Sequence, residues 1–137
     1  MTDRQDILTE CHNMVSHRFH YQSDDKTFGR PEYWMSYAKD VIEGKDFTGD
    51  CDDFCMTMVE VLVDHYQIPR SDIRMVICDV EAGRGRHIVC TVDDVDTTIV
   101  LDNRYSYIMP WEDLSAYTWI MYAIMDKPNF WIEWPTE

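Results

Sequence analysis

The spacing of apolar residues changes partway along the chain, and this change constrains the fold more than any other feature. Up to about residue 66, apolar residues recur every three or four positions, as on one face of a helix. From residue 73 onward they gather in short runs rich in β-branched residues, which are typical of strands. Helices followed by hairpin-linked strands predict an α+β domain with a small antiparallel sheet. A length of 137 residues predicts a single domain over residues 1–137.

Three helices are expected in the first half. The first begins after a cap at residue 2 or 3 and ends near residue 20. The second covers residues 31–44, because Pro31 suits the first turn of a helix. The third begins at Asp50, and Pro69 closes this region of the chain.

The second half is expected to form a four-stranded sheet. Its predicted strands are residues 73–80, 86–92, 98–102 and 118–124. The sequence "EAGRGR" has the composition of a hairpin, and "PWEDLSAY" predicts one short helical turn. The last residues form a tail that its aromatic side chains would hold.

Composition narrows the class of partner. Apolar residues make up 45% of the chain and aromatic residues 13%, which favours a folded globular protein. The formal net charge of −14 would repel nucleic acid and anionic lipid, so neither is expected to bind. An acidic protein that imitates nucleic acid is the alternative. No apolar stretch is long enough for a membrane span.

The cellular compartment is predicted from the start of the chain and from its cysteines. The sequence "MTDRQDILTE" lacks the basic and apolar regions of a secretory signal. The five cysteines are odd in number and show no repeating spacing, which favours buried thiols in a reducing compartment. The expected location is therefore the cytoplasm. The protein could be a small factor encoded by a phage.

The sequence "GDCDDFC", residues 49–55, places a thiol among three carboxylates. Negative neighbours disfavour a thiolate, so this is an unusual setting for a reactive cysteine. Asp50 suits the cap of the third helix, which puts Cys51 in its first turn. Backbone amides at a helix start lower a thiol pKa and can donate to an oxyanion, which partly offsets the carboxylates.

A nucleophilic thiol also needs a base. His87 is the one histidine on a predicted strand, and Asp102 ends the next strand. Hairpin-paired strands can bring these two side chains within hydrogen-bond distance, about 2.6–3.2 Å. Cys51, His87 and Asp102 then have the types required for nucleophilic catalysis. The same residues also fit a capped helix, a sheet histidine and an Asp-Asn turn, and that alternative stays open.

Three motifs in this order resemble the bacterial transglutaminase-like cysteine proteinases. They are "GDCDDF" at a helix start, "RHIV" on a strand and "VLDN" on the next, and the match extends from about Tyr33 to Tyr122. The resemblance implies a papain-like, transglutaminase-like core with Cys51 as nucleophile, His87 as base and Asp102 as its orienting carboxylate. It also implies a hydrolase, most simply a peptidase, or an acyltransferase acting on an amide of a protein or peptide.

The resemblance further implies a calcium ion. Similar members that process adhesins bind calcium beside the triad, and the acidic residues flanking their cysteine match Asp50 and Asp52. A cation there would neutralise the carboxylates around the thiol. The simpler alternative is that both residues only cap the helix.

Three further alternatives remain. The first is a catalytically idle, acidic protein-binding or inhibitory factor on the same fold. In the second, Cys55 joins the three triad residues in a zinc site, although a buried Cys55 acting as a small apolar residue fits better. In the third, Arg84 and Arg86 contact an acidic substrate, although a solvated hairpin explains them as well.

Overall fold

The computed structural model of the chain describes residues 3–22, 36–80 and 86–134. Its helices and strands, in chain order, are α1 (Asp3–Arg18), β1 (Phe19–Tyr21), α2 (Ala38–Ile42), β2 (Phe47–Gly49), α3 (Cys51–Asp64), β3 (Ile73–Val80), β4 (Arg86–Asp93), β5 (Thr98–Leu101), β6 (Met109–Pro110), β7 (Tyr117–Ile124) and β8 (Ile132–Glu133). Two single turns of 3-10 helix, η2 (Arg70–Asp72) and η3 (Trp111–Asp113), connect some of them.

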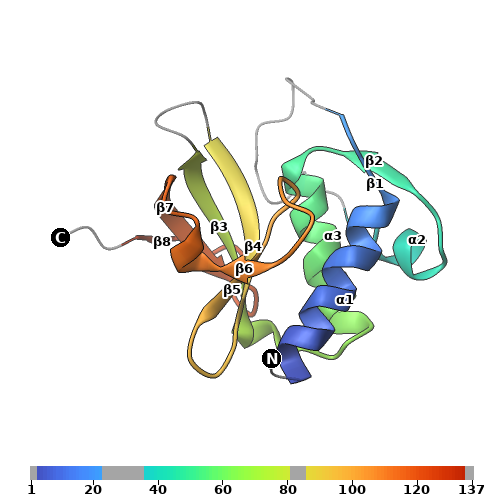
Figure 1. Ribbon diagram of the computed structural model, residues 1–137, viewed down its shortest axis with the longest axis horizontal. Helices are drawn as coiled ribbons and strands as arrows, with labels where there is room; N and C mark the ends of the chain where they lie inside the picture. The colour runs from blue at the N-terminus through green and yellow to red at the C-terminus, as the bar shows by residue number, and fades with distance from the viewer. Residues whose placement is uncertain (1–2, 23–35, 81–85, 135–137) are drawn as a thin grey trace.

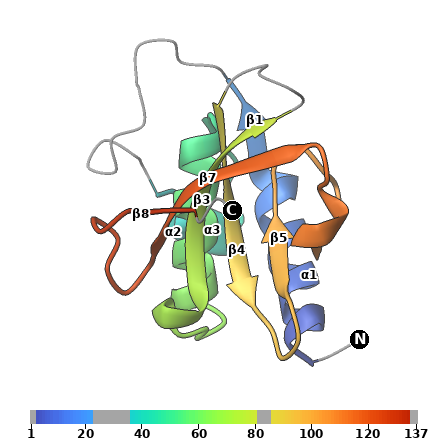
Figure 2. The same cartoon turned by 90° about the vertical axis from the view of Figure 1, so that its left-hand side faces the viewer.

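The described elements form two layers. Helices α1 and α3 lie side by side against one face of the sheet, as Figures 1 and 2 show from two directions. The sheet is antiparallel and six-stranded, with the order β6-β5-β4-β3-β7-β8. The α+β class and the transglutaminase-like fold are confirmed.

The sequence located the main strands well and the second helix poorly. The runs predicted over residues 73–80, 86–92, 98–102 and 118–124 correspond to β3, β4, β5 and β7. The short turn predicted before β7 is η3. Within the described residues the second helix is only α2, and residues 31–35, where it was expected to begin, lie outside them. The predicted glycine hairpin also lies outside them, apart from Arg86.

A small parallel sheet was not predicted. The first helix ends at Arg18 because the chain continues into β1, which pairs with β2. Tyr21 pairs with Gly49, and the Gln22 amide donates to the Gly49 carbonyl over 2.8 Å. This pairing fixes the backbone two residues before Cys51, so it positions the start of α3.

The main core lies between the helices and the sheet. Helix α3 buries an apolar face against β4, and Phe54 is fully buried at the centre of this packing. Burial of a side chain of this kind contributes roughly 1.5–3 kcal/mol. The other buried residues of α3 are Cys55, Thr57, Met58, Val59, Val61 and Leu62. This packing holds the α3 N-terminus beside the start of β4.

A second, smaller core covers the opposite side of the sheet, which we call the outer face. Val76, Val89 and Val100 are buried there, and Tyr117 packs with them. Aromatic side chains of β7 and the C-terminal segment lie over this cluster. The outer face therefore has an apolar cover that is built largely from aromatic rings.

None of the helices within the described ranges is long and apolar enough to cross a membrane.

Candidate active site

Cys51 is the first residue of α3, and local contacts fix this helix start. Asp50 Oδ1 accepts hydrogen bonds from the amides of Asp52 and Asp53, over 3.1 and 3.4 Å. In return, Asp53 Oδ2 accepts from the Asp50 amide over 3.3 Å, which completes a capping box. A Cβ at Gly49 would lie 2.5 Å from Asp53 Oδ2, so this compact start requires glycine there.

His87 and Asp102 are in direct contact, as the strand pattern predicted. His87 is the second residue of β4, and Asp102 directly follows β5. The His87 Nε2 atom lies 2.7 Å from Asp102 Oδ1, and the two side chains are 9% and 2% exposed. Since Asp102 engages Nε2, Nδ1 is the ring nitrogen left to exchange a proton with a nucleophile.

Asp102 is the centre of a hydrogen-bond network. The Tyr117 hydroxyl donates to Oδ2 over 2.5 Å, and the Arg104 amide donates to Oδ1 over 3.0 Å. The buried His12 Nε2 lies 3.0 Å from the Asp102 carbonyl oxygen, to which it donates. Burial alone would raise the pKa of Asp102, but hydrogen bonds from His87, Tyr117 and Arg104 outweigh it and lower the pKa. Asp102 is therefore a stable buried carboxylate.

The Cys51 thiol contacts the strand that carries His87. Its Sγ is 3.8 Å from Asp52 Oδ1, and it hydrogen-bonds with the backbone of Ile88, the residue after His87. Cysteine, histidine and aspartate thus lie near one another. Burial and then Asp52 raise the pKa of Cys51 to about 12, against the lowering effect of the Ile88 hydrogen bond. Burial and Asp52 therefore outweigh the partial offset predicted for the start of the helix, and they favour the protonated thiol.

The carboxylates around the thiol are poorly compensated. Burial and the charges of Asp50 and Asp53 raise the pKa of Asp52 to about 6. Burial and Asp53 also raise the pKa of Asp50. Asp50 and Asp52 are therefore crowded negative groups near the nucleophile, although one oxygen of Asp50 is already engaged in the helix cap.

The other four cysteines differ from Cys51. All five are free thiols, but Cys11, Cys55, Cys78 and Cys90 are buried, whereas Cys51 is partly exposed. The Cys55 Sγ lies 3.3 Å from the Ile88 carbonyl oxygen inside the main core, where it acts as a small apolar residue. Among the described residues, no group of three or more His, Cys, Asp or Glu side chains could hold a metal, so the zinc alternative gains no support there.

Three residues of the Asp102 network were not predicted from the sequence. Tyr117 and Arg104 contact Asp102 through tertiary structure and the turn after β5, and neither belongs to a motif identified from the sequence. The signal for His12 was present, because it lies four residues after Leu8 on the apolar face of α1. Arg86 is exposed at the start of β4, and Arg84 lies outside the described residues.

Comparison with known families identifies the class. The sequence profile of the family described as "Bacterial transglutaminase-like cysteine proteinase BTLCP" matches residues 1–137. The chain belongs to this family of cysteine proteinases. Comparison with curated proteins gave no significant match.

Solved structures of one protein share the fold. Legionella pneumophila LapG superposes with a TM-score of 0.69 at 19% identity, covering 89% of this chain and 64% of that chain. Its EGTA-treated form gives 0.66 at 20% identity, covering 85% and 61%. Its calcium-bound form gives 0.65 at 20% identity, covering 86% and 68%. The chain thus spans about two thirds of the length of these relatives, and the likeness establishes the fold alone.

Proposed function

We propose that the protein is a cysteine peptidase in which Cys51 attacks a peptide carbonyl, His87 transfers protons and Asp102 orients His87. The observation that carries this proposal is the 2.7 Å contact between His87 Nε2 and Asp102, at the start of the strand whose backbone contacts the Cys51 thiol. Membership of a cysteine proteinase family supports a protein or peptide as substrate.

The acylation step follows from the resting state of the thiol. Cys51 is protonated, so its proton moves to His87 Nδ1 as sulfur attacks the carbonyl carbon. The buried carboxylate of Asp102 stabilises the imidazolium that forms. His87 then gives this proton to the leaving amine as the carbon–nitrogen bond breaks, which leaves an acyl group on Cys51.

Deacylation uses the same residues in reverse. His87 Nδ1 accepts a proton from water, the resulting hydroxide attacks the thioester, and the proton returns to the Cys51 sulfur as the acid product leaves. An amine in place of water would make the product a new amide, which is acyl transfer. The Cys51 amide is the candidate oxyanion donor, because the Asp50 side chain already engages the amides of Asp52 and Asp53.

We also propose that Asp50 and Asp52 hold a calcium ion. Burial and the neighbouring carboxylates raise the pKa values of both residues, and a divalent cation with oxygen ligands would relieve this crowding of negative charge. Backbone carbonyls and water would complete its ligands, since no third acidic side chain among the described residues joins them. The calcium-bound form of LapG supports this proposal. A bound cation would supply positive charge that lowers the pKa of the thiol.

The idle binding factor is the second candidate. The thiol pKa of about 12 favours it, because a thiol so hard to ionise reacts slowly unless His87 removes its proton. The two candidates differ in whether Cys51 reactivity depends on His87.

A labelling experiment separates them. The protein is treated briefly with a limiting amount of a peptidyl vinyl sulfone, and the modified cysteine is located by mass spectrometry. We expect modification at Cys51, its loss in Cys51→Ala, and labelling at least about tenfold slower in His87→Gln. His65→Gln is the matched control, since His65 is exposed at the far end of α3. Equal labelling of wild type and His87→Gln would instead support the idle factor.

A further inference from the structure

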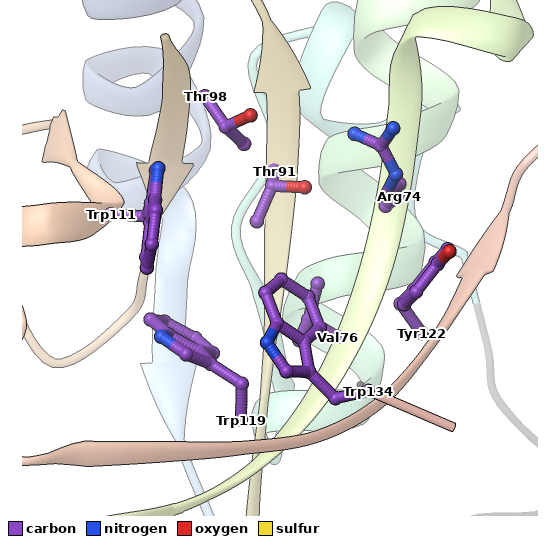
Figure 3. A pocket seen from close by; sticks show the side chains of 8 residues that line it. All are labelled: Arg74, Val76, Thr91, Thr98, Trp111, Trp119, Tyr122 and Trp134. Atoms are coloured by element: carbon purple, nitrogen blue, oxygen red, sulfur yellow. The ribbon is translucent and has the colours of Figure 1, made fainter. Parts of the chain in front are cut away.

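A pocket of about 290 Å³ opens on the outer face of the sheet, away from Cys51. Trp111, Trp119 and Trp134 gather around it, and Tyr122 closes one side (Figure 3). Trp134 is at the centre of this group, with ring centroids 6.4 Å from Trp111, 6.0 Å from Trp119 and 5.6 Å from Tyr122. These rings come from η3, β7 and the segment after β8, so tertiary structure assembles a wall of π faces.

The floor of the pocket carries polar groups. Arg74 and Thr91 are cross-strand partners on β3 and β4, and Figure 3 shows them on neighbouring strands, above Trp134 in this view. Arg74 forms an ion pair with Asp93 over 2.5 Å, and the Thr98 hydroxyl donates to the same Asp93 oxygen over 3.1 Å. The positive charge of Arg74 is therefore already paired within the protein.

Thr91 is the polar group that lacks such a partner. It is only 3% exposed, yet its Oγ1 has no hydrogen-bond partner among the described residues. A buried hydroxyl without a partner is costly, and a ligand that supplies a hydrogen bond relieves that cost. The aromatic wall and this hydroxyl without a partner are two independent indications that the pocket receives a ligand.

Charge restricts what that ligand can be. A cation would approach the Arg74 guanidinium, which already lies 5.6 Å from the centre of the Tyr122 ring. An anion would meet an arginine whose charge is paired with Asp93, on a protein with a net charge of −14. An uncharged molecule meets neither difficulty, and aromatic rings favour offset or edge contacts with tryptophan and tyrosine.

We propose that this pocket binds an uncharged aromatic ring system that carries one N–H or O–H group, with Thr91 Oγ1 as its hydrogen-bond acceptor. The volume is near the lower end of small-molecule sites, which suits one or two fused rings. The ligand is either a free molecule or the side chain of a peptide. The proposal does not depend on the peptidase activity, since no triad residue lines the pocket.

The experiment uses four indole compounds and the full chain, with binding measured by calorimetry and by the NMR shift of the Thr91 amide. Indole is neutral, tryptamine is its cationic analogue, indole-3-acetate is its anionic analogue, and 1-methylindole lacks the N–H. We expect indole to bind with a Kd on the order of 1 mM or lower. Both charged analogues should bind at least about fivefold more weakly, since the pocket offers no unpaired charge. The methyl analogue should bind about three- to tenfold more weakly, since it cannot donate to Thr91.

Variants assign the contacts. Thr91→Val should make indole and 1-methylindole bind equally, and it should leave the affinity for 1-methylindole unchanged. Trp111→Leu should weaken all binding about tenfold and keep the fold, because Trp111 is 39% exposed. Phe130→Leu removes an aromatic ring that is 65% exposed and outside the pocket, so it should change nothing.

Three results would overturn the proposal. They are no binding of indole up to its solubility limit, tighter binding of tryptamine than of indole, and unchanged binding in Trp111→Leu. A comparison with N-acetyl-tryptophanamide identifies the source of the ligand. Tighter binding than indole supports a peptide side chain, and weaker binding supports a free aromatic molecule.

Discussion

Two carboxylates of the candidate active site, Asp102 and Asp52, have pKa values that shift in opposite directions. Asp102 is almost fully buried, yet its pKa is lowered, whereas the pKa of Asp52 is raised to about 6. Burial disfavours the charged form of both. The difference lies in the partners, because Asp102 accepts hydrogen bonds from His87, Tyr117 and Arg104, whereas Asp52 lies between two other carboxylates.

The comparison assigns a different role to each side of the site. On the strand side, hydrogen bonds from His87, Tyr117 and Arg104 compensate the negative charge of Asp102, which holds the imidazole of His87 in one tautomer. On the helix side, Asp50, Asp52 and Asp53 carry excess negative charge, which disfavours the Cys51 thiolate and favours binding of a cation. A change on the strand side should therefore reduce catalysis, and a change on the helix side should alter stability and thiol reactivity.

The largest effect is expected from Asp102→Asn, which removes the charge that stabilises the imidazolium and no longer fixes the ring tautomer. The rate constant for peptidyl vinyl sulfone labelling, or kcat/KM where a substrate is known, should fall about 10²- to 10⁴-fold. Asp113→Asn is the control, because Asp113 is exposed in η3. A labelling rate constant of Asp102→Asn within about twofold of wild type would contradict a role for Asp102 in the mechanism.

Tyr117→Phe should have the next largest effect, because it removes one donor from a buried carboxylate. We expect the free energy of unfolding to fall by about 1–3 kcal/mol at pH 7 and the labelling rate to fall about tenfold. Tyr107→Phe, at a tyrosine that is 62% exposed, should change neither.

The sign of the pH dependence follows from the lowered pKa of Asp102. A depressed carboxyl pKa stabilises the fold above the unfolded pKa, and this contribution is lost as pH falls through the folded value. Tyr117→Phe reduces the depression, so its deficit should shrink toward acidic pH in denaturant titrations. A deficit that is constant with pH would mean that the hydroxyl acts through packing alone.

The sequence predicted what depends on local pattern and on short-range pairing. The cap at Asp50 uses amides two and three residues away, and the His87–Asp102 contact follows from adjacent strands. Two features depend on contacts with no periodic signature, namely the β1–β2 pairing and the Tyr117 hydroxyl. The helical spacing of α1 places His12 on its apolar face but does not indicate its partner, the Asp102 carbonyl. The extent to which burial raises the pKa of Cys51 was not predicted, because it depends on the tertiary packing of α3 on β4.

Asp52→Asn tests the helix side. The raised pKa means that the folded state binds more protons than the unfolded state between about pH 4 and pH 6, so ionisation of Asp52 destabilises the fold as pH rises through this window. In chelator at pH 7 the variant should be about 1–2 kcal/mol more stable than wild type, with the gain vanishing near pH 4. Its thiol should also be alkylated faster at a fixed pH. Asp126→Asn, at an exposed site, is the control, and a destabilised Asp52→Asn would contradict the excess of charge.

Calcium binding should give the smallest of these effects, an increase in thermal stability. At about ten times its Kd, the ion should stabilise the fold by about 1.4 kcal/mol, which raises the Tm by a few degrees. Asp50→Asn should keep the helix cap and lose this response, since asparagine caps a helix about as well as aspartate. Identical melting curves in chelator and in millimolar calcium would contradict the proposed calcium site.

Cleavage of a peptide library tests the central claim most directly. Wild-type protein and Cys51→Ala are incubated with a mixture of peptides that covers many sequences, and new termini are identified by mass spectrometry. The triad predicts new termini that recur within one sequence context with wild type and are absent with Cys51→Ala. The same termini from both proteins, or none from either protein with and without calcium, would contradict a peptidase that acts through Cys51.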